Sequence, residues 1–318
     1  MPLRQPQVPG DAARLEEVSV AAPKPAPSVG PAPAPVAPPA PAKPREPLAA
    51  WHDTALREFL AAQWPRLELE VVASTGSTNT DLLERLRLGD TRPRLRVAER
   101  QTAGRGRHGR MWRSEAGASL TFSLALPLER NDWSGLSLAV GTALADALDA
   151  AHPPRIGLKW PNDLWVLDAP GRGRKLGGVL IETVAPPVLR VAVIGVGLNV
   201  RPSASVAGDA GAEGGLATLA ELDPSLDPPA AFARVAPALL RAVRRFDAEG
   251  FAAFHAAYGR RDGLAGHPVR TTHPQAPAGI AVGVMPHGAL VVRTAEGARV
   301  EVTSGEVTVR PSAGTLLR

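Results

Sequence analysis

Hydrophobic positions recur at helical spacing in several parts of the chain. Large apolar side chains return every three or four residues over 51–64 and form one stripe over 134–150, so both segments are predicted to be helices. The polar run 78–81 before an apolar stretch predicts a capped helix that stops at Gly89. A longer helix is expected at 228–247.

Shorter apolar stretches, several of them alternating with polar residues, predict strands. The expected strands cover residues 67–72, 95–99, 119–126, 155–160, 164–167, 178–183 and 189–200. Helices and strands follow one another without a strict strand–helix repeat. We therefore expect an α+β domain with a mixed, mainly antiparallel sheet, not a doubly wound one. Between 201 and 215 lies a Gly/Ala/Ser loop that carries little information.

The pattern changes near Gly266, where apolar and polar residues begin to alternate with turn signals at 286–288 and 296–297. This alternation predicts a small antiparallel barrel of about five strands. Two folded domains are expected, a larger catalytic one at 48–262 and a small one at 263–318.

The N-terminal segment has a different composition, with 11 Pro and 8 Ala in residues 21–47. Such a stretch buries too little apolar surface to offset its ordering entropy, so residues 1–47 are expected to be disordered. They could serve as a tether, be a solvated tail, or lie upstream of the true start of translation. No apolar run approaches the ~20 residues of a membrane span and no secretory signal is recognisable, so a soluble, cytoplasmic protein is expected.

Residue usage narrows the chemistry. The 318 residues include no Cys, which excludes disulfides, thiolate metal sites and a cysteine nucleophile. Of the 36 basic residues only four are Lys, and two of these lie in the tail. Arg can replace Lys as a surface charge but not where a compact ammonium is needed. Lys159 and Lys175 are therefore the first candidates for function.

Residues 101–113 combine glycine with arginine at positions 105, 107, 110 and 113. The segment contains G-x-G-x-x-G, but no apolar helix follows, so it does not fit a dinucleotide fingerprint. Glycine permits close backbone approach, and guanidinium groups pair bidentately with phosphate or carboxylate. We expect a mobile loop that orders around a small anionic ligand. A nucleic-acid patch is the alternative.

Three further segments place scarce or small residues at strand ends. They are Lys159-Trp-Pro-Asn-Asp163, Lys175-Leu-Gly-Gly178 and Gly195-Val-Gly-Leu-Asn199. The first exposes three polar groups around a turn, although an ordinary hairpin would also explain it. The glycines of the second allow a ligand to approach the backbone. The histidines are dispersed, and no P-loop or H-E-x-x-H is present.

Six segments in order resemble the motif set of biotin–protein ligases: Ser77-Thr-Asn79, the Gly/Arg run 101–110, the three segments just described, and Ser304-Gly-Glu-Val-Thr-Val-Arg310. The resemblance spans about 70–310. It implies a catalytic core like that of class II aminoacyl-tRNA synthetases, followed by an SH3-like barrel. It also suggests a form without the DNA-binding domain that some members carry, because the tail is short and has five basic against four acidic residues.

The resemblance implies an ATP-dependent ligase. Biotin would be activated as biotinyl-5′-AMP, with release of pyrophosphate, and passed to a lysine of a biotin carboxyl carrier domain of acetyl-CoA carboxylase or a related enzyme. Mg²⁺ would be carried mainly by ATP, with no protein metal ligand assigned. A monomer or homodimer is expected, without DNA or membrane binding. The alternatives are a lipoate–protein ligase and a nucleic-acid-binding regulator.

Matching positions of the motifs imply the site residues. Lys175, Arg105 and Arg107 are the catalytic candidates, with Lys175 placed between the biotin carboxylate and the α-phosphate. The implied biotin-binding set is completed by Ser77, Thr78, Asn79, Gln101, Gly104, Trp112 as an aromatic lid, Gly178 and Gly195. The ATP or adenylate side is assigned Arg110, Lys159, Asn162, Asp163, Asn199 and Arg310. Lys159 could be catalytic or could orient Asp163.

Overall fold

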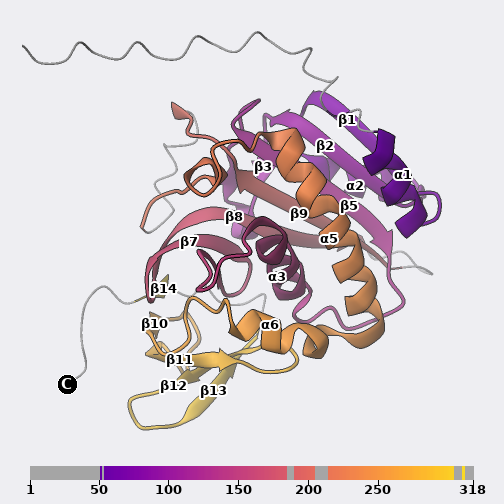
Figure 1. The fold of residues 1–318 in the computed structure, drawn as a ribbon. Helices are drawn as coiled ribbons and strands as arrows, with labels where there is room; N and C mark the ends of the chain where they lie inside the picture. The colour runs from indigo at the N-terminus through magenta and orange to yellow at the C-terminus, as the bar shows by residue number, and fades with distance from the viewer. Residues whose placement is uncertain (1–50, 52–53, 185–189, 205–213, 304–309, 312–318) are drawn as a thin grey trace, which may run out of the picture. The chain divides into compact units, whose positions relative to one another are not determined.

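The computed structural model describes residues 51, 54–184, 190–204, 214–303 and 310–311, the last two as backbone only. All of them belong to one compact unit, Pro44–Arg318. The expectations for the tail 1–47 and for the motif residues 304–309 lie outside the described residues. Figure 1 shows the two larger sheets of this unit.

In the described part of the chain, seven strands form a mixed sheet in the order β1-β2-β5-β9-β8-β7-β6. Only β1 and β2 pair in parallel among them, and the remaining pairs are antiparallel. The α+β expectation with a mainly antiparallel sheet is thereby confirmed. The strands are β1 (Glu68–Thr75), β2 (Arg94–Gln101), β5 (Ser119–Pro127), β6 (Ile156–Lys159), β7 (Asp163–Ala169), β8 (Arg172–Val184) and β9 (Val191–Asn199).

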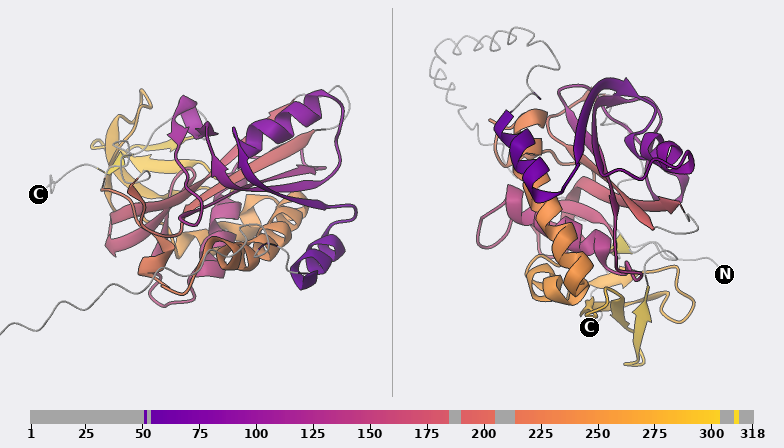
Figure 2. Two further views of the ribbon diagram at one scale, coloured as in Figure 1. Left: turned by 90° about the horizontal axis from the view of Figure 1, so that it is seen from above. Right: turned by 90° about the vertical axis from the view of Figure 1, so that its right-hand side faces the viewer.

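Helices cover both faces of this sheet (Figure 2). Helix α2 (Thr78–Arg87) packs Leu82 and Leu83 on one face, and α3 (Leu136–Leu148) and α5 (Pro228–Glu249) lie on the other. Side chains of a strand alternate between its two faces, so β5 and β9 serve both cores. Helix α1 (Thr54–Gln63) packs beside α5.

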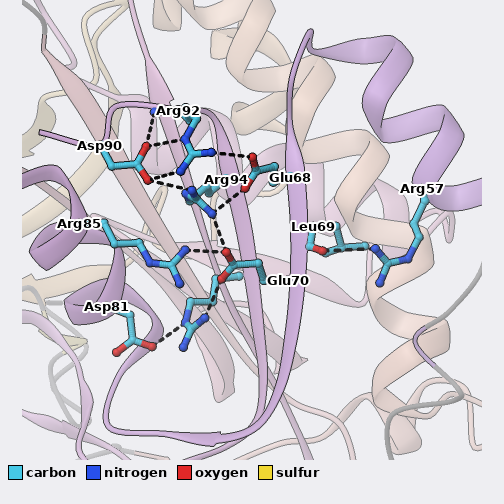
Figure 3. A network of polar contacts seen from close by, with 10 residues as sticks. Arg57, Glu68, Leu69, Glu70, Asp81, Arg85, Asp90, Arg92 and Arg94 are labelled. Atoms are coloured by element: carbon cyan, nitrogen blue, oxygen red, sulfur yellow. Dashed lines mark hydrogen bonds and ion pairs between the residues drawn. The ribbon is translucent and has the colours of Figure 1, made fainter.

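Helix α2 is the crossover between the parallel strands β1 and β2, and polar contacts fix it to both (Figure 3). Arg85 of α2 contacts Glu70 of β1 at 2.6 Å, and Asp81 of α2 contacts Arg96 of β2 at 2.6 Å. Burial alone would raise the pKa of Glu70, but hydrogen bonds from Arg85 and Arg96 hold that pKa below its ordinary value. Both the first and the last turn of α2 are thus held against the first halves of β1 and β2.

The C-terminal part confirms the expected alternation. Among the described residues, five antiparallel strands pair in the order β13-β12-β11-β10-β14, and the turns at Gly288 and Gly297 have positive φ. They are β10 (Pro268–Arg270), β11 (Ala278–Val284), β12 (Leu290–Arg293), β13 (Arg299–Val302) and β14 (Arg310–Pro311). Trp160 joins the two sheets through a hydrogen bond from Nε1 to the Gly288 carbonyl at 2.9 Å.

Short helical turns at the junctions were not anticipated. They are η3 (Leu219–Glu221), η4 (Phe251–Phe254) and α6 (His255–Gly259). Several expected strands differ in extent. The strand expected at 178–183 begins earlier, at Arg172, because a hairpin with β7 extends it, and the one expected at 189–200 is the shorter β9.

Candidate active site

The turn that opens α2 lies against the end of β2. Ser77 caps the helix by accepting a hydrogen bond from the Thr80 amide, and Thr78 donates to Gln101 Oε1 from both its amide (2.7 Å) and its hydroxyl (3.0 Å). Ser77, Thr78 and Asn79 are all buried. Residues that the motifs had assigned to one end of biotin are therefore neighbours in space.

Asn79 is held by two residues that the sequence analysis missed. Its Nδ2 donates to Glu182 Oε2 at 2.9 Å, and its Oδ1 accepts from Ser123 Oγ at 2.5 Å. The Ser123 hydroxyl also lies 2.6 Å from Thr78 Oγ1. Ser123 had no signal of its own, because it continues the alternation of a strand. Glu182 carries a weak signal in the sequence, because it is a carboxylate that follows an apolar stretch.

Glycines keep the sheet beneath this turn open. A Cβ at Gly195 would collide with the Asn79 amide oxygen, and one at Gly197 would meet the Trp112 indole at 2.5 Å. Gly178 pairs with Gly197 across β8 and β9, and its missing Cβ would point at Asp163. The sheet therefore presents bare backbone between Asn79, Trp112 and Asp163.

Residues 101–113, called the Gly/Arg segment below, contain a small hairpin where the sequence predicted only a loop. Strands β3 (Gly104–Arg105) and β4 (Met111–Trp112) pair, and η2 (Arg107–Gly109) turns between them. A Cβ at Gly104 would collide with the Trp112 carbonyl, so glycine is needed for this pairing. His108 (φ 54°) and Gly109 (φ 72°) supply the left-handed turn.

Arginines of this segment reach two different parts of the sheet. Arg105 Nη2 lies 3.1 Å from Glu182 Oε1, and Arg107 donates to Asn162 Oδ1 at 3.2 Å. Burial lowers the pKa of the Arg107 guanidinium, an effect that Asp163 opposes and Arg110 reinforces. Arg110 itself is exposed.

A β-bulge places Lys175 on the same face as Asp163. Asp163 pairs with Gly178 and Trp165 pairs with Lys175, so β8 has one extra residue between these pairs. Side chains alternate along a regular strand, so without the bulge Lys175, three residues before Gly178, would point to the opposite face. Its ammonium instead lies 3.0 Å from Asp163 Oδ1.

The backbone of Lys175 is also fixed on its other side. Its amide donates to the Gly215 carbonyl at 3.0 Å, and its carbonyl accepts from Ala217 at 2.9 Å and from the Asn199 side chain at 3.3 Å. Residues 215–217, which follow the undescribed residues 205–213, thus continue the pairing of β8. Part of the loop that seemed uninformative in the sequence supports the lysine.

Lys159 lies between an aromatic ring and the Asp163 turn. Its ammonium lies 4.8 Å from the centre of the Trp165 ring, which is a cation–π distance, and its backbone pairs with Asp163. Asn162 donates from Nδ2 to the Val179 carbonyl at 2.9 Å, which holds the turn against β8. Arg310 belongs to β14, but its side chain lies outside the described residues.

The site therefore has two polar clusters joined by the Gly/Arg segment. One contains Thr78, Asn79, Gln101, Ser123 and Glu182, and the other contains Lys175, Asp163 and Asn162. Such an arrangement can hold a neutral polar ring at one end and two anionic groups at the other. In the described residues no group of three or more His, Cys, Asp or Glu side chains could hold a metal ion.

Comparisons with known proteins agree with this geometry. Residues 71–199 match the biotin/lipoate A/B protein ligase family, and residues 266–310 match the biotin protein ligase C-terminal domain. The biotin–[acetyl-CoA-carboxylase] ligase of Paracoccus denitrificans is 32% identical over 238 residues, covering 72% of this chain and 96% of that protein.

A ligase of the same name from Mycobacterium tuberculosis is 46% identical over 142 residues, covering 42% of this chain and 49% of that protein. The aligned part thus spans about half of that relative's length. The biotin protein ligase of Aquifex aeolicus in complex with biotin and ATP superimposes with a TM-score of 0.63 at 27% identity, over 77% of this chain and 99% of that one. By its fold, its two matched regions and these relatives, the chain belongs to the biotin–protein ligase family.

Proposed function

We propose that the chain activates biotin with ATP as biotinyl-5′-AMP and transfers it to a lysine of a biotin carboxyl carrier domain. One observation carries the proposal. The Gly/Arg segment contacts both polar clusters of the site: Arg105 contacts Glu182 in the first, and Arg107 contacts Asn162 in the second. A molecule bound between this segment and the sheet would therefore touch both clusters. Family membership and the relatives' names support the assignment.

In the first step a biotin carboxylate oxygen attacks the α-phosphorus of ATP. A bond forms between the carboxylate oxygen and the α-phosphorus. The bond between the α-phosphorus and the oxygen that bridges to the β-phosphate breaks, and pyrophosphate leaves. Two anions must meet, so cations that face both of them lower the barrier. The ammonium group of Lys175 is small enough to lie between the two anions. Arg105 and Arg107, on the Gly/Arg segment, neutralise the carboxylate and the phosphate.

In the second step a neutral lysine amine of the carrier attacks the acyl carbon. An amide forms, AMP leaves, and the amine proton goes to solvent or to AMP. No covalent bond to the enzyme is required, which suits a chain with no cysteine. The acceptor we propose is the carrier domain of acetyl-CoA carboxylase, because the relatives are named for that enzyme.

Mg²⁺ fits the nucleotide side only as a companion of ATP. Asp163 is a single carboxylate already paired with Lys175, and Mg²⁺ commonly takes one or two protein carboxylates together with substrate phosphates. When bound, the ion would neutralise phosphate charge. For the remaining scaffold we propose a class II synthetase-like core at 48–262 and an SH3-like domain at 263–318.

The test is mass spectrometry of a purified carrier domain incubated with the chain, biotin and Mg-ATP. The expected product is a carrier heavier by one biotinyl group, formed only when ATP is present. Lipoate in place of biotin is the control for the neighbouring ligase class. An unmodified carrier, or equal modification by lipoate, would contradict the proposal.

A further inference from the structure

Glu182 joins two groups that belong to separate sequence motifs. Its Oε2 accepts the hydrogen bond from Asn79, and its Oε1 lies 3.1 Å from Arg105 Nη2. The side chain is only 20% exposed, and a carboxylate in such a place needs donors or a counter-charge. The structure supplies one of each, and they come from α2 and from the Gly/Arg segment.

On the Asn79 side, the contacts of Glu182 determine how the amide is turned. A carboxylate accepts only, so the Asn79 nitrogen must face Glu182 and its oxygen must face Ser123. Ser123 in turn lies beside Thr78, which donates to Gln101. The polar chain from Gln101 to Glu182 is therefore continuous.

On the Arg105 side, Glu182 holds one end of a guanidinium group. Within the described residues it is the one charged partner of Arg105, whose side chain is 50% exposed. A guanidinium group has five donors in a rigid plane, so a contact at one nitrogen leaves others to face an anion. The segment's second arginine, Arg107, is bound elsewhere, at Asn162.

We propose that Glu182 is a positioning residue for biotin: it orients Asn79 and holds Arg105 by one nitrogen, so that less ordering of this arginine is left to biotin binding. An arginine on a glycine-rich segment would otherwise have to be ordered during binding, and that ordering weakens affinity. The proposal rests on the proposed function, because biotin is the molecule it assigns to this surface.

The test compares Glu182→Gln with Arg105→Gln and with the double variant. The glutamine keeps an oxygen to accept from Asn79 but removes the charge that faces Arg105. Direct calorimetry of biotin without ATP should show affinity about tenfold weaker for Glu182→Gln, as expected for losing a charged partner. In the Arg105→Gln background the same change should weaken binding less than about threefold. KM for biotin should rise while KM for ATP stays close to that of the unmodified chain.

Glu249→Gln is the matched control, since it breaks an exposed pair with Arg245 by the same chemical change and should leave biotin binding unaltered. Glu182→Asp, which keeps the charge but is shorter, should bind with intermediate affinity and guards against misfolding of the first variant. Unchanged binding by Glu182→Gln, or additive losses in the double variant, would overturn the role of Glu182. If the unmodified chain itself fails to bind biotin, the proposed function fails instead.

Discussion

At the scale of single residues, the site is built from side chains that contacts with neighbouring residues hold in one conformation. Lys175 is 25% exposed, its ammonium contacts Asp163, and its backbone is paired on both sides. Asn79 is bonded at both ends of its amide. Preorganised groups of this kind need little rearrangement when charge develops, which is how electrostatic catalysis works.

Replacing Lys175 by Arg should separate the two half-reactions. Arginine keeps the charge but spreads it over a wider planar group, which cannot occupy the place of an ammonium between two anions. We expect adenylate formation to fall on the order of 10²-fold or more, with smaller losses in biotin affinity and in transfer from supplied biotinyl-AMP. Pyrophosphate release measures the first step. A near-normal first step, or equal loss of both steps with a collapsed Tm, would contradict this role.

Replacing Gly195 by Ala should act on biotin and not on ATP. The added methyl group would collide with the Asn79 amide oxygen, so Asn79 must leave its bonds to Ser123 and Glu182. We expect KM for biotin to rise by about tenfold or more, the scale of one lost hydrogen bond to a charged group. Gly259→Ala is the control, because its Cβ meets nothing within 4 Å. Equal KM values in both variants would refute the close approach.

At the scale of elements, the sequence predicted what local patterns encode. The hairpin turns at Gly288 and Gly297 and the alternating strands are where the patterns placed them. The capped helix expected to open at 78–81 begins at Thr78, with Ser77 as its cap. The β-bulge beside Lys175 was not predictable because it depends on how β7 and β8 pair. The contacts of Ser123 and Glu182 were not predictable because they reach partners 44 to 103 residues away in the chain. Motifs indicated the candidate residues, but only packing shows which of them meet.

The Gly/Arg segment should exchange amide hydrogens more slowly once biotin is bound. Its hairpin has only two residue pairs, and its arginines carry charges that an anionic ligand would neutralise. Hydrogen exchange followed by mass spectrometry should show slower uptake over 104–112 with biotin and no change in α5. Equal protection in both states would contradict the expected ordering.

At the scale of the whole molecule, polar groups are buried at residues 261–262, between α6 and the C-terminal strands. Arg261 is buried and bonded to Asp149, and the neighbouring Asp262 has one buried oxygen, Oδ2, with no hydrogen-bond partner among the described residues. Burial raises the pKa of Asp262, although the Leu264 and Ala265 amides oppose that shift.

In the described part of the chain no helix is long and apolar enough to cross a membrane.

This buried carboxyl makes stability depend on pH in a defined direction. Because the pKa of Asp262 is higher in the folded state, its ionisation disfavours folding, and the penalty grows as pH rises through the folded value. Asp262→Asn keeps the oxygen that caps Leu264 but removes the charge. We expect its Tm to exceed that of the unmodified chain at pH 8, with the difference shrinking towards pH 4. Asp168→Asn, at an exposed position, should show no such trend, and a pH-independent difference for Asp262→Asn would refute the argument.

The bond between Asn79 and Glu182 also has a kinetic consequence. It joins helix α2 to strand β8 through residues that are 103 positions apart in the chain. Contacts of such sequence separation close large loops and form late during folding. In a refolding experiment, biotin-binding competence should therefore appear after the far-ultraviolet signal of secondary structure has recovered. The hydrogen bonds from Gln101 to Glu182 would then form only after β2, β5 and β8 have paired in register, so binding of biotin would report a correctly assembled sheet.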